Sequence, residues 1–464
     1  MNSNSKSTMV PIEMLRKYDR PGPRYTSYPT VPVWSDQVGI EQYQMALKES
    51  STKTDKPLAI YCHIPFCRKR CYYCGCNTTV SEQPNVVDNY LKCLFNEMTQ
   101  TAELLGNRKN ISQLHFGGGT PTYLNIEEFG RVMDTIEGLF AFEKNSEKSI
   151  EIDPRVTSNE QLEFLAERGF NRVSLGVQDF DCDVQEAIGR EQSIDIVKEK
   201  VNVCRSLGFK GINFDLIYGL PLQTPKSFTE TLKKTIDLRP DRLAVYSFAY
   251  LPKMRANQAK INAEELPPAE KKYELFSLAV ELFTGAGYNQ IGMDHFALPE
   301  DELSTAQNDG RLFRNFMGYT VQASDEMIGF GMSSIGYICN TFFQNISTLN
   351  KYQKSVKELD WAIFRGKKLN DDDLIRQYLI TQLMCNFKLK FESLKECFGI
   401  EYSEYFKNED TRLDEFINDG FLKRIKNGLE VTPVGRTFVR NIAMVYDTYL
   451  TKPDSKGTTF SRTI

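Results

Sequence analysis

Short apolar segments alternate with longer amphipathic segments between residues 58 and 248. Six segments have the length and residue types of buried strands: Leu58–Ile64, Ile111–Phe116, Lys148–Asp153, Arg172–Gly176, Gly211–Ile217 and Arg242–Phe248. Hydrophobic residues recur at helical spacing between them, near residues 84–104, 126–139, 158–168, 194–207 and 226–237. This alternation predicts an α/β fold with a parallel sheet. Six such units favour a partial (β/α)6 TIM-like barrel, short of the eight units of a complete one.

Proline and turn-forming residues dominate the segment before this alternation. The stretch Pro21-Gly22-Pro23-Arg24-Tyr25-Thr26-Ser27-Tyr28-Pro29-Thr30 cannot form a long helix or a central strand, because proline lacks an amide donor and fixes φ. Its aromatic and β-branched residues favour packing over disorder. We therefore expect residues 1–57 to form an N-terminal arm over the active site, which in a barrel lies at the carboxyl ends of the strands.

The pattern changes again after the sixth predicted strand. We expect the barrel to span residues 58–300, with a helix near 268–285, and residues 301–364 to form its extension and connection, including the glycine-rich stretch Gly329–Gly336. Later, helical spacing precedes two apolar segments around Asn427-Gly428, a strong type I′ hairpin signal. Residues 365–464 are therefore predicted to form a mainly helical, winged-helix-like domain. Its predicted helices are Asp371–Cys385, Phe391–Phe398 and Thr411–Asp419.

Composition and charge narrow the functional classes. The chain has 464 residues, 41% of them hydrophobic and 25% charged, with a formal net charge of -4. It contains no apolar run of the roughly 20 residues that span a bilayer, and Met1–Met9 lack the apolar core of a secretory signal. We expect a cytoplasmic protein without a membrane span. The acidic balance argues against nucleic-acid binding. A winged-helix DNA-binding protein with an iron–sulfur sensor is an alternative, although no basic recognition stripe supports it.

Five of the eleven cysteines lie between Cys62 and Cys76. Cys67, Cys71 and Cys74 form a Cys-x-x-x-Cys-x-x-Cys pattern on the predicted loop after the first strand. Thiolates are soft ligands that suit zinc, Cu(I) or iron–sulfur clusters. A structural zinc site commonly draws four ligands from two separated pairs, whereas a cubane cluster can be held by closely spaced cysteines. An iron–sulfur cluster is favoured, and a zinc protein is the alternative. We expect Cys76 not to be a ligand.

Glycine and polar residues follow the predicted strands. Phe116-Gly117-Gly118-Gly119-Thr120-Pro121-Thr122 comes after the second strand, where glycine lets the backbone approach a ligand closely. Other residues fall where later strands should end: Glu151, Asp153, Gln178, Arg190, Asp215 and Ala249. Each residue alone is as consistent with structure as with function. Together they predict a ring at one mouth of the barrel, which is where sites of this architecture lie.

Several motifs resemble those of one enzyme family. The stretch 21–30, Tyr61-Cys-His-Ile-Pro-Phe-Cys67, Cys71-Tyr-Tyr-Cys74-Gly-Cys76-Asn77, residues 115–124, residues 174–180, residues 215–221 and Gly292-Met-Asp-His-Phe296 are similar to oxygen-independent coproporphyrinogen III oxidases. These are radical S-adenosylmethionine (SAM) enzymes, and the spacing of the three cysteines matches the radical SAM signature. The resemblance covers nearly the whole chain. It implies that residues 58–300 are a radical SAM barrel.

The resemblance also implies cofactors and their contacts. One [4Fe-4S] cluster would be held by Cys67, Cys71 and Cys74, leaving one iron for SAM. A first SAM would be bound by Tyr61, Gly118, Glu151, Ala249 and Ile335. A second SAM would be bound by Tyr73, Gly119, Thr120, Gln178, Arg190 and Asp215.

The implied reaction is the anaerobic oxidative decarboxylation of two propionate side chains of coproporphyrinogen III to vinyl groups. A 5′-deoxyadenosyl radical would start it, and protoporphyrinogen IX would be formed for haem biosynthesis. No side chain is predicted as a general acid or base. The substrate carries four carboxylates, and Arg24 is the candidate contact because arginine pairs well with carboxylates. A reductant such as flavodoxin or ferredoxin is implied, and we expect a monomer; the final electron acceptor is left open. A haem-binding radical SAM chaperone or another haem-handling relative is the alternative.

Overall fold

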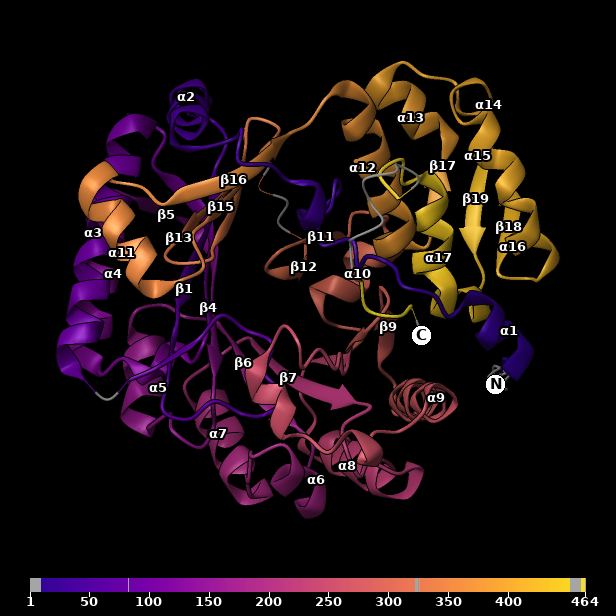
Figure 1. Cartoon of the computed structure of the whole chain (residues 1–464), viewed down its shortest axis with the longest axis horizontal. Helices are drawn as coiled ribbons and strands as arrows, with labels where there is room; N and C mark the ends of the chain where they lie inside the picture. Colours follow the sequence, from indigo (N-terminus) through magenta and orange to yellow (C-terminus); the bar gives the residue numbers. More distant parts are fainter. Residues whose placement is uncertain (1–9, 82, 322–323, 325, 451–459, 464) are drawn as a thin grey trace.

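A mixed sheet of twelve strands, counted over the described residues, organises the larger part of this computed structural model (Figure 1). Its order is β16-β15-β14-β13-β1-β4-β5-β6-β7-β8-β10-β9. The six predicted strands lie side by side in chain order and pair in parallel. They are β1 (Leu58–Ile64), β4 (Asn110–Gly118), β5 (Ala141–Ile152), β6 (Arg172–Gln178), β7 (Gly211–Tyr218) and β8 (Arg242–Ser247). The predicted α/β architecture is therefore confirmed.

The structure describes residues 10–81, 83–321, 324, 326–450 and 460–463. Met1–Met9, which carry part of the predicted arm, lie outside the described residues, as do residues 451–459 of the predicted C-terminal domain. Among the described helices, none is both long enough and apolar enough to cross a membrane.

Helices cover the outer face of the sheet between successive strands (Figure 1). The helices expected there form as α3 (Pro84–Leu105), α4 (Ile126–Leu139), α5 (Asn159–Glu167), α7 (Ile194–Ser206) and α8 (Pro225–Leu238). Several begin at capping boxes, in which a side chain such as that of Asn125 or Ser158 accepts a bond from the third helical amide. Helix α6 (Cys182–Ala187) is additional and too short to leave a periodic pattern. Strand β5 begins at Ala141 rather than at the predicted Lys148. Its first part is polar and largely exposed, so it does not show the apolar pattern from which the strand was predicted.

Further strands lengthen the sheet at both edges. On one edge β13 (Met327–Phe330) pairs in parallel with β1, and three antiparallel strands follow. These are β14 (Ile335–Ile338), β15 (Thr341–Asn345) and β16 (Ile363–Lys368), with α11 (Leu349–Leu359) before the last. The glycine-rich stretch thus becomes β13, a turn and β14. Gly329 and Gly336 permit this, because a Cβ on either would lie under 3.0 Å from backbone of the facing strand.

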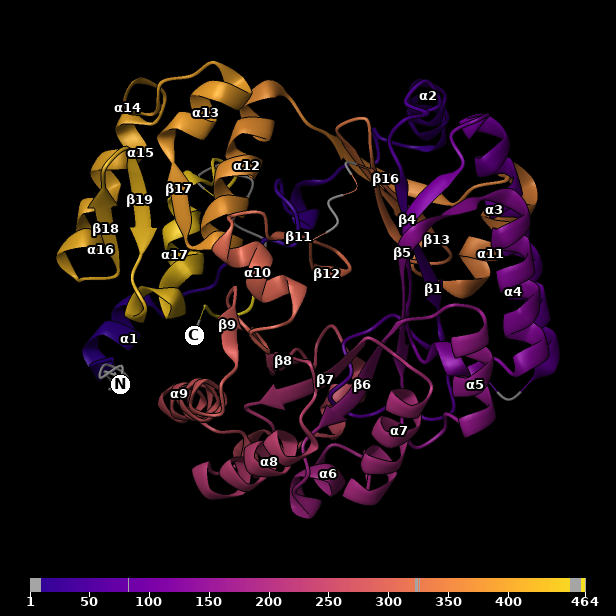
Figure 2. The same ribbon diagram turned by 180° about the vertical axis from the view of Figure 1, so that it is seen from behind.

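On the other edge, antiparallel strands follow β8. β10 (His295–Ala297) pairs with β8, and β9 (Asn289–Ile291) pairs with β10. Helix α9 (Ala269–Gly285) precedes them, and α10 (Glu302–Asn308) leads to the hairpin of β11 (Phe313–Asn315) and β12 (Gly318–Thr320). Both views place this hairpin between the large sheet and the C-terminal domain (Figures 1 and 2).

The C-terminal domain contains a small sheet, β17-β19-β18, and forms most of a second hydrophobic core. Residues of the N-terminal arm and of the segment from α9 to β12 complete this core. Its order of helix, strand, helices and hairpin agrees with the winged-helix-like prediction. The elements are α12 (Asp371–Asn386), β17 (Lys388–Lys390), α13 (Phe391–Phe398), α14 (Tyr402–Tyr405), α15 (Lys407–Arg412), α16 (Asp414–Asn418), β18 (Leu422–Ile425), β19 (Gly428–Val431) and α17 (Val439–Ala443). The hairpin forms as expected, with Asn427 at a φ of 59°. The single helix expected over Thr411–Asp419 is divided between α15 and α16.

The N-terminal arm links the two parts of the molecule. Helix α1 (Ile12–Tyr18) packs on the C-terminal domain, where the Tyr18 ring lies 5.1 Å from that of Phe416. Residue Pro21 then forms a bridge with Arg462, near the C-terminus. Helix α2 (Ile40–Ser50) returns the chain to the large core, against which Leu47 is fully buried.

Candidate functional site

The three motif cysteines lie on one loop at the carboxyl end of β1. The loop starts at β2 (Phe66–Cys67), which pairs with β3 (Thr79–Val80) and so closes it at its base. Cys71 is buried, and Cys67 and Cys74 are partly buried. Because the loop follows the carboxyl end of β1, all three thiols lie at the mouth of the barrel, as predicted from the sequence.

A glycine run lies directly against this loop. The amide of Gly119 donates to the Ile64 carbonyl (2.8 Å), and a Cβ on Gly119 would lie 2.6 Å from the carbonyl oxygen of Phe66. Gly118 has a φ of 115°, a left-handed conformation that favours glycine, and a Cβ there would lie 2.5 Å from the His63 ring. Thr120 follows, with Oγ1 3.6 Å from the Cys67 sulfur. Glycine is therefore required in this run, because only glycine lets the end of β4 pack this closely against the cysteine loop.

The electrostatic surroundings of the three thiols differ. Burial raises the pKa of the Cys67 thiol to about 11, opposed by its hydrogen bond with Thr120. A hydrogen bond from Cys76 lowers the pKa of the Cys74 thiol to about 6. Two guanidinium groups donate to the Cys71 sulfur, from Arg190 at 3.6 Å and from Arg155 at 3.7 Å. Each of the three sulfurs thus has a hydrogen-bonding group or a positive charge close to it, most of them from segments outside the loop.

The donor set can be tested against an iron–sulfur cluster. In the described part of the chain, no group of three or more His, Cys, Asp or Glu side chains is arranged to hold a single metal ion. The fit to a cubane rests on donor chemistry: Cys67, Cys71 and Cys74 are free thiols on one loop, which is how such clusters are held. The nearby guanidinium groups also suit an anionic cluster. The residues present therefore fit a [4Fe-4S] group with three protein ligands.

Polar residues predicted from β1 and β5 meet inside the barrel beside this loop. The Tyr61 hydroxyl lies 3.0 Å from Nδ1 of His63, and its ring stacks on His115 at 5.9 Å. Glu151 accepts from the Gly118 amide at 3.1 Å and lies 3.6 Å from His115 Nε2. Burial raises the pKa of Glu151, but the hydrogen bond from His115 and the Gly118 amide outweigh it and lower the pKa. Glu151 is therefore held as a carboxylate facing the lumen.

The neighbouring strand ends bring three more of the predicted residues together. Asp215 on β7 accepts from Ser174 (3.0 Å) and Asn213 (2.9 Å), and burial, with the nearby charge of Glu151, raises its pKa to about 6. Gln178 ends β6 with a φ of 68°. Arg190 donates to the Gly176 carbonyl at 2.7 Å, which places it at the same strand end. A lumen cavity of about 130 Å³ is lined by both Glu151 and Asp215.

The last three predicted contacts lie around the same mouth. The carbonyls of Tyr73 and Ala249 both accept from the Gln258 side chain, at 2.9 and 3.2 Å. Ile335 opens β14, where its carbonyl faces Gly329, and Gly329 is the register partner of Tyr61. The predicted cofactor residues thus lie within the parallel strands, at their carboxyl ends, on the loops that follow them or, for Ile335, at the start of the antiparallel strand β14.

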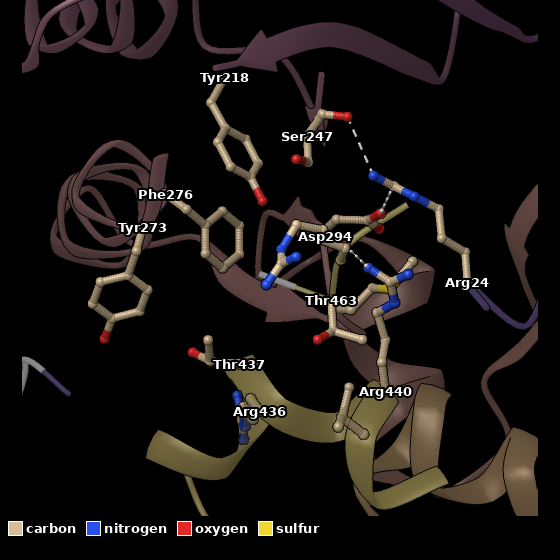
Figure 3. Close-up of a pocket in the computed structure, with 13 residues that line it drawn as sticks. Arg24, Tyr218, Ser247, Tyr273, Phe276, Asp294, Arg436, Thr437, Arg440 and Thr463 are labelled. Carbon is tan, nitrogen blue, oxygen red and sulfur yellow. Dashed lines mark hydrogen bonds and ion pairs between the residues drawn. The ribbon is translucent and has the colours of Figure 1, made fainter. Parts of the chain in front are cut away.

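Arg24 lies in a separate small pocket next to this mouth (Figure 3). It donates to the Ser247 carbonyl at 3.2 Å and forms an ion pair with Asp294 at 3.4 Å. The cavity measures about 50 Å³ and is also lined by Tyr218 and Arg440. Figure 3 shows Arg24 reaching in from the right and Arg440 from below, with Tyr218 and Ser247 above them. The arm, two strand ends and the C-terminal domain therefore build one pocket rich in hydrogen-bond donors.

Comparison with known proteins gives matches over nearly the whole chain. Residues 61–235 match the radical SAM superfamily, and residues 369–438 match the HemN C-terminal domain. Oxygen-independent coproporphyrinogen III oxidases from Salmonella typhimurium and Escherichia coli are each 42% identical over 453 residues, covering 98% of this chain and 98% of the relative. The chain belongs to the oxygen-independent coproporphyrinogen III oxidase family.

Solved structures support this family assignment. The coproporphyrinogen III oxidase of Escherichia coli, described as a radical SAM enzyme, superposes with a TM-score of 0.90 at 41% identity. That match covers 95% of this chain and 99% of the solved one. Members of the radical SAM superfamily use a [4Fe-4S] cluster and SAM, so membership agrees with the cysteine loop described above.

Two functional features of this oxidase-family chain escape sequence reasoning. Asn257 donates to the carbonyls of Cys71, Tyr72 and Cys74, all within 3.1 Å, and so fixes the shape of the cysteine loop. Arg155 reaches Cys71 from the loop after β5. No motif marks Asn257, because its partners are backbone atoms far away in sequence. For Arg155 the only signal is its position just after Asp153 at a strand end.

Proposed function

We propose that this protein catalyses the oxygen-independent oxidative decarboxylation of two propionate groups of coproporphyrinogen III to vinyl groups. The product would be protoporphyrinogen IX, an intermediate of haem biosynthesis. The observation that carries the proposal is the three-thiol loop packed against Gly118 and Gly119, in a chain of which 98% is matched by oxidases of that name. The haem-handling alternative is not favoured, because the oxidases of that name align with 98% of the chain, including its C-terminal domain.

We further propose one [4Fe-4S] cluster on Cys67, Cys71 and Cys74 and two SAM molecules. The first SAM would contact Tyr61, Gly118, Glu151, Ala249 and Ile335. The second would contact Tyr73, Gly119, Thr120, Gln178, Arg190 and Asp215. When bound, these cofactors supply the 5′-deoxyadenosyl radical that removes hydrogen from a propionate. The support is that residues of both sets lie within the parallel strands, at their carboxyl ends or on the adjoining segments, and that Glu151 of one set and Asp215 of the other line one cavity.

The chain's own residues bind and orient in this proposal. Glu151 is a carboxylate with fixed hydrogen bonds, suited to a cationic ligand such as SAM. Asp215, with a pKa of about 6, carries less of its negative charge near neutral pH than an ordinary aspartate does. The arm and the C-terminal domain meet over this side of the barrel and would exclude water. No general base is assigned.

The Arg24 pocket is proposed to hold one substrate carboxylate. Its cavity of about 50 Å³ is of the size of a carboxylate group, and Arg24 and the Tyr218 hydroxyl face it. The Arg24 side chain is 28% exposed, so it can bind a ligand without a large rearrangement. Charge-assisted hydrogen bonds of this kind contribute about 1.5–3 kcal/mol.

Arg24→Ala tests the carboxylate contact. We expect KM for coproporphyrinogen III to rise between about 10-fold and 100-fold, because the substrate loses a charge-assisted bond. Arg24→Lys should retain part of the affinity. Arg16→Ala is the matched control, since Arg16 lies on the same arm in an exposed ion pair with Glu270. Unchanged KM and turnover in Arg24→Ala would show that this contact is wrong.

Anaerobic assay tests the proposed reaction as a whole. Protein reconstituted with iron and sulfide receives dithionite, SAM, coproporphyrinogen III and a one-electron acceptor, because each propionate radical releases one electron as it loses CO2. The porphyrinogens are separated by chromatography after oxidation. We expect a product with two vinyl groups. Iron-loaded protein that cleaves SAM without forming vinyl groups would contradict the proposal, and a stoichiometric zinc content would contradict the cluster itself.

The cellular setting is proposed on chemical grounds. The cluster needs an external one-electron reductant, and a flavodoxin or ferredoxin is of the right class. We propose a cytoplasmic monomer that binds no nucleic acid, in agreement with the formal charge of -4. Size-exclusion chromatography with light scattering of the anaerobic holoprotein tests the monomer.

A further inference from the structure

Two arginines converge on the sulfur of Cys71. Arg155, on the loop after β5, places Nη2 3.7 Å from Sγ. Arg190, on the loop after α6, places Nη1 3.6 Å from the same atom. Cys71 is itself buried, with 6% of its surface exposed. This thiol therefore receives two charged donors in a region of low solvent access, where such interactions are strong.

An aspartate holds the two guanidinium groups in place. Asp153 accepts from Arg155 Nε at 3.0 Å and Nη2 at 2.7 Å, and from Arg190 Nη1 at 3.1 Å. Burial raises the pKa of Asp153, but the hydrogen bonds and charges of both arginines outweigh it and lower the pKa. Asp153 is therefore ionised at neutral pH. One negative and two positive charges leave the trio with a net charge of about +1 beside the sulfur.

The two arginines differ in what else they contact. Arg190 also donates to the Gly176 carbonyl at 2.7 Å, and it is one of the residues assigned above to the second SAM. The hydrogen bonds of Arg155 go to Asp153 and to the Cys71 sulfur. Arg155 thus shares both of its partners, Asp153 and Cys71, with Arg190, but it has no assigned cofactor role. Its placement needs an explanation of its own.

The reduction potential of an iron–sulfur cluster responds to nearby charge and to hydrogen bonds at its sulfurs. Reduction adds one electron from an external donor, so the cluster becomes more negative and an N–H donor at a ligand sulfur stabilises the reduced form. We propose that Arg155 raises the reduction potential of the cluster through its bond to Cys71, and that Asp153 limits this effect as the counter-charge. The proposal rests on the proposed function only in taking Cys71 as a cluster ligand.

Substitution at the two positions should shift the potential in opposite directions. Arg155→Met removes the charge and the donor, and Asp153→Asn removes the counter-charge while keeping an acceptor oxygen. We expect Arg155→Met to lower the equilibrium constant for one-electron reduction about tenfold, which is about 59 mV for a one-electron couple. We expect Asp153→Asn to raise it. General damage to the loop would not produce two opposite shifts.

The experiment is a redox titration of full-length, anaerobically reconstituted protein without SAM or substrate. The signal of the reduced cluster is followed by electron paramagnetic resonance, and iron is counted in each sample. Arg131→Met is the control, because the Arg131 guanidinium on α4 pairs with the partly exposed carboxylate of Asp88 rather than with a cysteine sulfur. Its potential should stay that of the unsubstituted protein. Arg155→Lys keeps the charge and should lie between the unsubstituted protein and Arg155→Met.

Two results would overturn the proposal. One is a potential in Arg155→Met that matches the Arg131→Met control, and the other is a shift of the same sign in Arg155→Met and Asp153→Asn. If Arg155→Met does not retain iron, Arg155→Lys and Asp153→Asn decide by the same criterion. Failure of the proposed function is distinct, because an unsubstituted protein with zinc or without a cluster signal contradicts the cysteine assignment. An intact cluster with unshifted potentials contradicts only the role of Arg155.

Discussion

The cysteine loop and the Arg24 pocket lie near one barrel mouth but are assembled differently. All three thiols come from a single loop within residues 67–74. The pocket joins Arg24 from the arm, Tyr218 and Ser247 from two strand ends, Asp294 from the turn after β9, and Arg440 from the C-terminal domain. Cofactor chemistry is therefore encoded locally, whereas the proposed substrate contact exists only after distant segments have packed together.

The two regions are also held by different interactions. The loop is fixed by Asn257, by the glycine run and by the guanidinium groups at Cys71. The pocket depends on Arg440, which donates to the carbonyls of Gly22, Pro23 and Arg462 and so ties both chain ends to the C-terminal domain. Substitutions in one region should therefore leave the other intact, and four experiments test this separation.

Cys71→Ser should have the largest effect. A serine hydroxyl is a poor replacement for a soft thiolate, so we expect the cluster content to fall and porphyrinogen turnover to be lost. The measurement is iron content, cluster spectrum and vinyl product under anaerobic conditions. Cys397→Ser is the control, since Cys397 is an exposed thiol on α13. A Cys71→Ser protein with a full cluster and normal turnover would remove the basis of the loop assignment.

Gly118→Ala should have the next largest effect. The methyl group would meet the His63 ring at a φ of 115°, and strain at such a position costs on the order of 1–3 kcal/mol. A shift of about 1 Å at a reacting site can reduce turnover about 100-fold. Turnover and the thermal midpoint check this. Gly138→Ala on α4 should leave turnover unchanged, because an added Cβ there would meet no atom within 4 Å outside its own helix turn. Equal behaviour of the two variants would contradict the glycine requirement.

Arg440→Met should release the arm without affecting the cluster. Loss of a buried donor leaves carbonyls such as those of Gly22 and Pro23 unpaired, at about 1–3 kcal/mol each. We expect faster limited proteolysis before residue 30, a KM raised about 10-fold and an unchanged iron content. Arg412→Met is the control, because Arg412 bonds to the Val445 carbonyl within the C-terminal domain. Loss of iron in Arg440→Met would show that the two regions are coupled.

Asp215 should produce the smallest effect, a pH-dependent change in stability. Its pKa in the folded chain is about 6, against an ordinary value of 3.8, so the folded state binds the proton more tightly. This stabilisation is present below about pH 4 and is lost as the pH rises through 6, by at most about 1.4 kcal/mol per pH unit.

Asp215→Asn should remove this pH dependence. The measured quantity is the thermal midpoint of the variant minus that of the unsubstituted protein at the same pH. This difference should be more favourable to the variant at pH 7.5 than at pH 4.5. Asp237→Asn on the exposed face of α8 is the control and should show no such gain. A difference between Asp215→Asn and the unsubstituted protein that stays constant across this pH range would contradict the raised pKa.

Much of the fold could be predicted from local patterns. The six parallel strands and their helices leave strong alternating signals, and Asn427-Gly428 marks its hairpin by a preference for positive φ. The polar start of β5 and the short helix α6 leave weak signals in the sequence. The first part of β5 is largely exposed, and α6 is too short to show a helical repeat of hydrophobic residues. Strands β13 and β14 could not be predicted from the sequence pattern, because glycine is not typical of strands. Here Gly329 and Gly336 let the two backbones approach each other closely. Such a requirement is visible only once the partner strand is known.

The amino-acid sequence by itself determined the parallel α/β architecture, the family resemblance and the three thiols, because each depends on spacing along a short segment. Only the tertiary structure decided which distant groups meet these thiols: Arg155 at Cys71, Asn257 at the loop carbonyls, and Arg440 at the arm. The physical reason is that hydrogen bonds and charges act over a few ångströms in space. Folding sets those distances between residues that are far apart along the chain.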